Sequence, residues 1–233
     1  MNTEIQDNLL TKWPTDKLFA VNISALREQN NSLAEKLQAQ HIPNSVQLQI
    51  SRDGSPNYRI EEQGKTRWLG YSWLPLISAK ANCGNVDIGS ENIALNEIGH
   101  GADIKFLLKK MQNHQALLVI ENNLLKIALA FRLHDFSIEL QQGRLILISD
   151  KNAQAGIVEF YNCHNGYALI QQTITRPYLS EQQNRRFAEM ITAAIEQVAN
   201  NSALKMQNLL ENARLNYSYN PVRLQYAKCY ASF

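Results

Sequence analysis

The chain has 233 residues, enough to bury a full hydrophobic core, and a formal charge of +2. This mild charge, without a dense run of Lys or Arg, excludes a dedicated nucleic-acid binder. No stretch is apolar for the roughly 18 residues of a membrane span, and the first residues lack the pattern of a signal peptide. We therefore expect a cytoplasmic protein with neither nucleic acid nor membrane as a partner.

The cysteines give no sign of a disulfide framework or a metal site. Cys83, Cys163 and Cys229 lie far apart in the sequence, and no C-x-x-C pair occurs. Structural zinc sites and disulfide-rich domains need closer or paired spacings. We expect no bound metal.

The N-terminal part is predicted to be one amphipathic helix over residues 16–40, which Pro43 ends. Its apolar residues recur at helical spacings on one face: Phe19, Ile23, Leu26, Leu33 and Leu37. A period-two stretch over 46–50 follows, then turns at Asp53-Gly54 and Gln63-Gly64 with strand-like residues after each. This pattern predicts a small antiparallel β-meander at about 46–70. Residues 71–90 are read as a link.

From residue 92 the pattern alternates between strand and helix. Strands are predicted at 92–98, 115–120 and 144–149, with helices at 102–112 and 123–134 between them. One or two further strands are predicted in 156–174, through Ile157–Phe160 and Tyr167–Ile170. Such alternation is typical of a parallel sheet with right-handed crossovers.

The C-terminal part is predicted to be helical. Ser180 and Gln183 form a capping-box signal before one apolar helix face, and a second helical run is expected at 202–214. The predicted fold class is α/β: a Rossmann-like parallel sheet preceded by a small antiparallel β-meander, with N- and C-terminal helices. The predicted domains are 1–90, 91–178 and 179–233.

The most informative segment is the glycine loop after the first parallel strand. Gly99 and Gly101 lie between an apolar run and a helix, and His100 lies inside the loop. Glycines let the backbone approach a ligand, and the N–H groups of the following helix favour anionic or polar ligand atoms. Three acids follow three predicted strands, at the edge where open α/β sheets bind ligands. The candidate binding residues are Glu97, Gly99, His100, Gly101, Asp103, Glu121 and Asp150.

The run Glu97-x-Gly99-x-Gly101 resembles the first motif of S-adenosylmethionine-dependent methyltransferases. That resemblance implies that Glu121 binds the ribose and that Asp150 lies near the adenine. Asp103 occupies the position of the usual third glycine, and its charge disfavours a phosphate there. The alternative is a tight turn that binds no ligand. His134 is predicted to end a helix, where a histidine interacts favourably with the helix dipole.

The order of several motifs resembles the N-terminal region of motility-associated-factor glycosyltransferases, which attach nonulosonic acids to flagellin. The resemblance covers about residues 46–215 and rests on Ser51–Tyr58, Gly64-Lys65, Trp68-Leu69, Ile93–Gly101, Leu129–Phe136 and Gly143–Leu145. It implies flagellin or another acceptor protein as a partner and a nucleotide or nucleotide-sugar as ligand. In that family a glycine-rich G-A-G-P-S-L type segment opens the catalytic domain, and none occurs before Phe233.

Three functions therefore stay open. The first is a non-catalytic accessory domain of such a glycosyltransferase. The second is a methyltransferase-like enzyme that uses S-adenosylmethionine, and the third is a Rossmann-like binding or assembly module. The residues alone assign no catalytic residue and no cofactor. They also leave open whether the chain forms a homo-oligomer.

Overall fold

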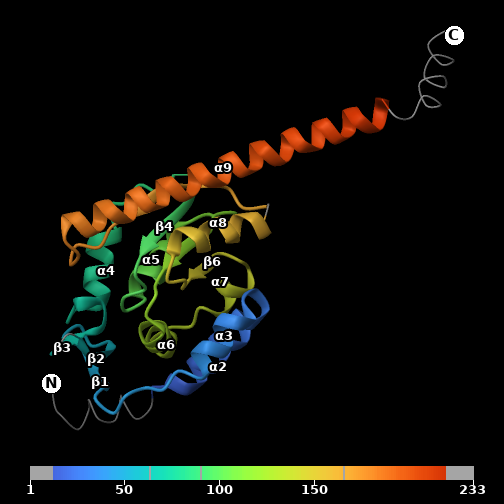
Figure 1. Cartoon of the computed structure of the whole chain (residues 1–233). Helices are drawn as coiled ribbons and strands as arrows, with labels where there is room; N and C mark the ends of the chain where they lie inside the picture. Colours follow the sequence, from blue (N-terminus) through green and yellow to red (C-terminus); the bar gives the residue numbers. More distant parts are fainter. Residues whose placement is uncertain (1–12, 63, 90, 165, 219–233) are drawn as a thin grey trace.

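The computed structural model describes residues 13–62, 64–89, 91–164 and 166–218, which form two sheets covered by helices (Figure 1). The first sheet is antiparallel, in the order β1 (Gln47–Ile50), β2 (Pro56–Glu62) and β3 (Lys65–Trp68). The second is parallel, in the order β6-β5-β4-β7. Its strands are β4 (Asn92–Asn96), β5 (Leu117–Ile120), β6 (Leu145–Ile148) and β7 (Ile170–Ile174). The predicted meander and parallel sheet are both confirmed.

The strand order creates a topological switch point between β4 and β7. The chain steps outward from β4 to β5 and β6, then returns to place β7 on the other side of β4. Connections therefore leave the two neighbouring strands in opposite directions, which opens a crevice at their carboxyl ends. Gly99 and Gly101 follow β4 directly, so they lie at this carboxyl edge as predicted.

Strands β4, β5 and β6 are buried along their length because they are largely apolar at successive positions, whereas the edge strand β7 is partly exposed. One face carries Leu95 and Val119 and packs against α5 (Ala102–Lys110), α6 (Leu124–Leu133) and the N-terminal helices. The other carries Ala94 and Leu118 and packs against α8 (Ala153–Cys163) and α9 (Glu181–Ser218). The result is a three-layer α/β/α arrangement.

The meander packs against α6 through a separate small core. Tyr58 and Ile60 of β2 contact Leu129 and Leu133 of α6. A 3-10 turn η1 (Leu69–Tyr71) and helix α4 (Pro75–Cys83) lead back to α5, where the sequence had suggested only a link. The turn predicted at Gln63-Gly64 includes Gln63, which lies outside the described residues, as does Cys229.

The N-terminal helix is broken, contrary to the single helix predicted over 16–40. Asn30 separates α2 (Thr15–Gln29) from α3 (Asn31–Gln38), with φ −149° and ψ 85°. Its side chain accepts a hydrogen bond from Leu33 N at 3.0 Å and so caps α3. The helical spacing of the apolar residues continues across Asn30, so the spacing alone predicts one unbroken helix.

The strand predicted at Ile157–Phe160 is wrong, because this segment belongs to α8. Asn152 caps that helix by accepting from Ala155 N, and a short apolar run fits a buried helix as well as a strand. The next strand begins at Ile170 rather than Tyr167. The two predicted C-terminal helices are one 38-residue helix, α9, whose sequence contains neither Gly nor Pro. The short helix α7 (Ser137–Gln141) was not predicted.

In the part of the chain that the structure describes, no helix is long and apolar enough to cross a membrane.

Asn22 of α2 anchors the N-terminal helices to the sheet layer. Its fully buried amide donates to Phe131 O (2.9 Å) and His134 O (2.7 Å) and accepts from Phe136 N (2.7 Å).

We expect Asn22→Ala to lower the free energy of unfolding by about 3 kcal/mol, because buried backbone groups lose their partners. Urea denaturation measures the change. Asn31→Ala, whose side chain binds only exposed Glu35, is the control and should change it by less than about 0.5 kcal/mol. Equal losses in both variants would contradict this role.

Candidate functional site

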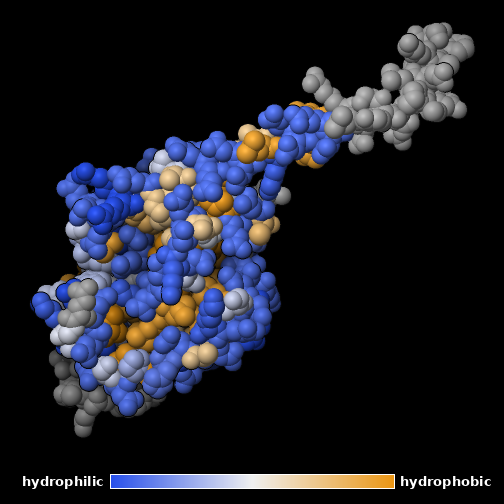
Figure 2. Space-filling view, in the orientation of Figure 1, coloured by the Kyte–Doolittle hydropathy of each residue, from blue (hydrophilic) through white to orange (hydrophobic). Residues whose placement is uncertain are grey.

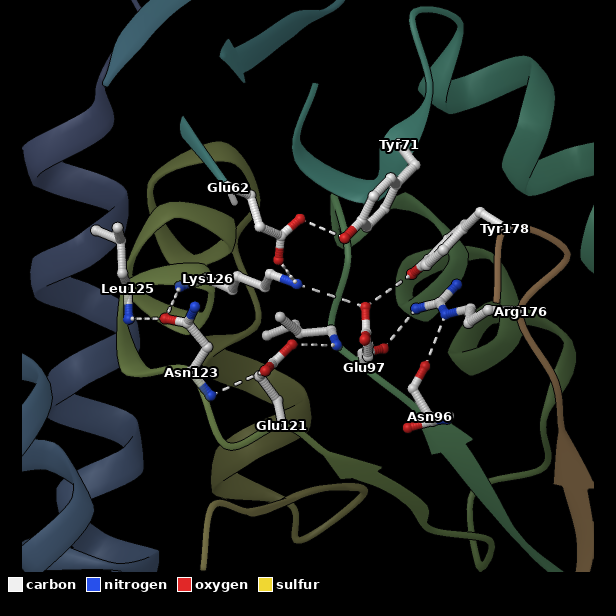
Figure 3. A network of polar contacts seen from close by, with 11 residues as sticks. Glu62, Tyr71, Asn96, Glu97, Glu121, Asn123, Leu125, Lys126, Arg176 and Tyr178 are labelled. Atoms are coloured by element: carbon white, nitrogen blue, oxygen red, sulfur yellow. Dashed lines mark hydrogen bonds and ion pairs between the residues drawn. The ribbon is translucent and has the colours of Figure 1, made fainter. Parts of the chain in front are cut away.

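The crevice at the switch point is filled by Arg176, which follows β7. Its Nε donates to Asn96 O (2.8 Å) and its Nη2 donates to Glu97 O (2.6 Å) (Figure 3). Its Nη1 pairs with the Asp103 carboxylate. The side chain is 2% exposed. Burial lowers the pKa of Arg176, but its interactions with Tyr178 and Asp103 outweigh that effect, so the pKa is raised. A charged guanidinium therefore occupies the place where the crevice would receive a ligand.

Two elements fix Arg176 in place. Asn184 of α9 accepts from Arg176 N (3.2 Å) and donates to Arg176 O (3.0 Å). Asp103 lies in the first turn of α5, which begins after the Gly101 cap. Arg176 thus links the carboxyl end of β4, the start of α5 and the start of α9.

Glu97 takes a left-handed backbone conformation directly after β4. Its φ is 59°, unfavourable for a residue with a side chain, so the surroundings have to hold it. The bond from Arg176 to its carbonyl does so. Its carboxylate lies 3.6 Å from Lys126 Nζ and 3.5 Å from the Tyr178 hydroxyl (Figure 3).

Lys126 joins the meander to the sheet edge. Its ammonium, on a side chain only 8% exposed, lies 3.0 Å from Glu62 of β2, which also accepts a hydrogen bond from the Tyr71 hydroxyl. Burial lowers the pKa of Lys126, but Glu97, Glu121 and Glu62 outweigh this and raise it. Tyr71 stacks on Tyr178 with ring centroids 4.6 Å apart. These contacts close the crevice from the meander side.

Glu121 is a buried acceptor of backbone hydrogen bonds at the sheet edge. It is 6% exposed, and its two oxygens accept from Asn123 N (2.9 Å) and Ile98 N (3.3 Å). Burial raises its pKa, while those amide donors and Lys126 oppose the rise. The carboxylate is buried because the segment that leads into the glycine loop lies beside it.

The glycines serve close packing inside the protein. A Cβ on Gly101 would lie 2.8 Å from His134 Cδ2 and 3.1 Å from Phe136 Cζ, and its φ is 94°. Gly70 (φ 71°) packs against the same loop, where a Cβ would lie 2.6 Å from His100 N. The backbone approaches neighbouring protein groups at these positions.

His100 and His134 form a buried hydrogen-bonded pair. His100 Nε2 donates to Pro56 O (3.0 Å), since a carbonyl only accepts, and His100 Nδ1 accepts from His134 Nε2 (3.2 Å). Burial lowers the pKa of both, that of His134 to about 3. His134 lies at the carboxyl end of α6 as predicted, where its buried ring pairs with His100.

The structure divides the predicted site residues among three places. Glu97 and Glu121 belong to the closed network, whereas His100 and Asp103 also line a cavity of about 260 Å³ beside Tyr71 and Tyr178. Exposed Asp150 lies apart from both, in a separate hollow of about 480 Å³ between α3 and α8. Sequence reasoning missed Arg176, Lys126, Glu62, Tyr71 and Tyr178. A cationic residue just past a strand end was the available signal for Arg176, but β7 was misplaced.

No group of three or more His, Cys, Asp or Glu that could hold a metal ion occurs among the described residues. Cys83 is buried and donates to Asp103 (3.7 Å), and burial raises its pKa to about 12. Cys163 is exposed at the end of α8.

No protein-family model matches the chain, and no curated protein matches it. Among solved structures, the chain is similar to the MAf glycosyltransferase from Magnetospirillum magneticum AMB-1. The identity is 14%, the match covers 82% of this chain and 35% of that chain, and the TM-score is 0.46. The chain thus spans about a third of that protein's length. A likeness at this level carries no functional argument, so function has to be inferred from the residues of the site.

We expect Arg176→Met to lower the free energy of unfolding by about 3–5 kcal/mol, because it leaves Asp103 and two carbonyls without their partner. Urea denaturation measures the loss. Arg185→Met removes the exposed ion pair with Glu181 on the same helix and should cost less than about 1 kcal/mol. If the two variants lose equal stability, Arg176 does not hold the crevice closed.

The histidine pair should make stability depend on pH. Both folded-state pKa values lie below the ordinary 6.5, so the unfolded chain binds more protons below that pH. The free energy of unfolding is therefore fully retained above pH 6.5 and falls below it, by up to about 1.4 kcal/mol per pH unit for each histidine.

His134→Gln is the matched variant, because its amide nitrogen can still donate to His100. Between pH 6.5 and 5 it should lose the His134 share of the slope, as followed by denaturation at each pH. Glu121, whose pKa is raised, gives a slope of opposite sign in both proteins and largely cancels in the comparison. Identical slopes would show that His134 is not held neutral.

Proposed function

We propose that this chain is a non-catalytic, Rossmann-like accessory module of a protein glycosyltransferase of the motility-associated-factor type, with flagellin or a similar protein as acceptor. The observation that carries the non-catalytic part is Arg176, whose buried guanidinium fills the crevice at the switch point. The order of motifs from Ser51 to Leu145 supports the family.

The charge of the network disfavours a nucleotide. Four carboxyl groups face three cationic groups there: Glu62, Glu97, Asp103 and Glu121 with Lys126, Arg176 and Arg67, which lies over the Tyr71 ring. A phosphate would meet this acidic excess. The cavity that His100 and Asp103 line, at about 260 Å³, is below the roughly 300–1,000 Å³ of usual ligand pockets. A second hollow of about 690 Å³ is lined by Arg176, Pro177 and Arg185.

The methyltransferase reading requires a Glu121 carboxylate free to accept from two ribose hydroxyls. Both of its oxygens already accept backbone N–H groups, and the ring pair Tyr71–Tyr178 and the Lys126 ion pairs enclose the network beside it. Binding S-adenosylmethionine would break these bonds without replacing them. A binding or assembly module with a closed crevice agrees with the same geometry, and acceptor binding separates it from the accessory role.

We expect no measurable heat when the chain is titrated with CMP or S-adenosylmethionine, and no transfer of sugar from a CMP-activated nonulosonic acid to flagellin. If the chain is an accessory module, it should bind unglycosylated flagellin, which titration calorimetry measures. Glu121→Gln, which keeps the shape of the side chain, is the control for any ligand that does bind.

The outcomes distinguish the readings. Micromolar binding of S-adenosylmethionine that Glu121→Gln abolishes would establish the methyltransferase reading. Sugar transfer by this chain would contradict the non-catalytic role. Absence of both ligand and flagellin binding would leave an assembly module.

A further inference from the structure

Strand β6 is an edge of the parallel sheet, and its free edge faces a hollow. In the order β6-β5-β4-β7, β6 pairs with β5 on one side and with no other described strand. The hollow of about 480 Å³ has β6 as its floor, α3 as one wall and α8 as the other. Figure 1 shows β6 between α8 and the N-terminal helices. Figure 2, in the same orientation, shows apolar surface recessed between the polar helices of the body.

The direction of the β6 main chain shows which of its groups point into the hollow. Glu121 N donates to Ile148 O at 3.0 Å, so this carbonyl faces β5. The N–H of Ser149 belongs to the same planar trans peptide and points the opposite way, into the hollow. Because successive residues of a paired strand alternate in direction, the N–H and the carbonyl of Leu147 point into the hollow as well.

These inward-facing groups lack partners in the part of the chain that the structure describes. Gln29 Nε2 donates to Leu145 O at 3.2 Å and so occupies one end of the edge. Beyond it, neither main-chain group of Leu147 nor the N–H of Ser149 forms a hydrogen bond with another described residue. Leu147 is only 5% exposed, and buried main-chain groups are normally paired. A second main chain running along β6 would supply the missing donors and acceptors in the right order.

The other edge strands carry polar side chains that oppose such pairing. Lys65 and Arg67 lie on β3, and charged side chains are a usual protection of sheet edges. Glutamine occupies two of the four positions of β1 and two of the five positions of β7. In contrast, β6 is apolar at all four of its positions. Among the described edges, β6 is therefore the one suited to an added strand.

The walls of the hollow determine which side chains an added strand should carry. Phe160 and Tyr167 line the α8 side, are half-buried, and have ring centroids 5.0 Å apart. Side chains of a strand alternate between its two faces, so every second residue of the added strand would meet these rings. Those positions favour apolar side chains.

The charges around the hollow favour a basic occupant. Three exposed carboxylates line it, against one ammonium group: Glu28, Asp150 and Glu159 with Lys36. None of these four residues forms an ion pair with another described residue. Lys or Arg side chains of a bound segment would complement this acidic excess.

We propose that β6 is a docking edge for an extended basic segment of a partner protein, which adds to the parallel sheet as a fifth strand. The segment pairs its main chain with Leu147 and Ser149 and places apolar side chains against Phe160 and Tyr167. Main-chain bonds give affinity and the walls give specificity, as in other cases of strand addition. The docking edge lies apart from the crevice that Arg176 fills, so this proposal does not rest on the proposed function.

Panning a library of displayed random peptides, about twelve residues long, on the full chain tests the proposal. Enriched peptides should carry apolar residues at alternate positions with Lys or Arg among the others. Synthetic copies should bind with micromolar dissociation constants in a fluorescence anisotropy titration.

Two substitutions in the hollow, each with a matched control, locate the binding. Ser149→Pro removes an inward N–H and should weaken binding at least about tenfold, whereas Ser149→Ala keeps this N–H and should bind as the wild type does. Glu159→Lys should weaken binding about fivefold at low salt, whereas Glu189→Lys, the same change at an exposed position of α9 outside the hollow, should not. Circular dichroism checks that each variant is folded. If no enriched peptide responds in this way, the proposal is overturned.

Methylated peptides test the strand pairing without relying on any variant of the protein. In an added strand every second N–H pairs with β6, and the N–H groups between them point away from it. N-methylation of one alternate set of amides should therefore abolish binding, and N-methylation of the other set should change it by less than about twofold. Equal effects of the two sets would show that the peptide does not pair with β6. Flagellin binding and sugar transfer are separate measurements, so a failure here leaves the proposed function standing.

Discussion

The buried guanidinium of Arg176 is the interaction on which the arrangement of this fold depends. It joins residues that the sequence keeps 73–80 positions apart: the carbonyls after β4, the Asp103 carboxylate and its own segment after β7. A buried ion pair offsets little more than its own desolvation, so its contribution is to geometry more than to net stability. It holds the left-handed turn at Glu97 and the start of α5 in one position.

The same interaction supplies from within the protein the charges that a Rossmann-like edge usually presents to a ligand. In a nucleotide site the N-terminus of the first helix meets an anion supplied from outside. Here Asp103 supplies the anion within that first turn, and Arg176 neutralises it. The ion pairs of Lys126 with Glu62 and Glu97 then connect the meander to the sheet edge. The crevice is thus filled by contacts between elements of the fold.

Sequence patterns predicted the parts of the fold that local periodicity determines. Leu117–Ile120 and Leu145–Ile148 are apolar on both faces, and the Gly99–Gly101 turn marks the sheet edge. Residues 157–160 were misread because a four-residue apolar run does not distinguish strand from buried helix. Asn22 contacts partners 109–114 residues away and Arg176 contacts partners 73–80 residues away, so no local pattern could reveal these contacts.

Helix α9 combines two roles that would normally fall to separate elements. Asn184 in its first turns fixes Arg176, and its buried face covers the sheet, while its far half projects beyond the body (Figure 1). Neither Gly nor Pro interrupts the 38 residues, so the helix has no built-in hinge. The ordering of the crevice by Asn184 and the cover of the sheet are consequences of one continuous helix.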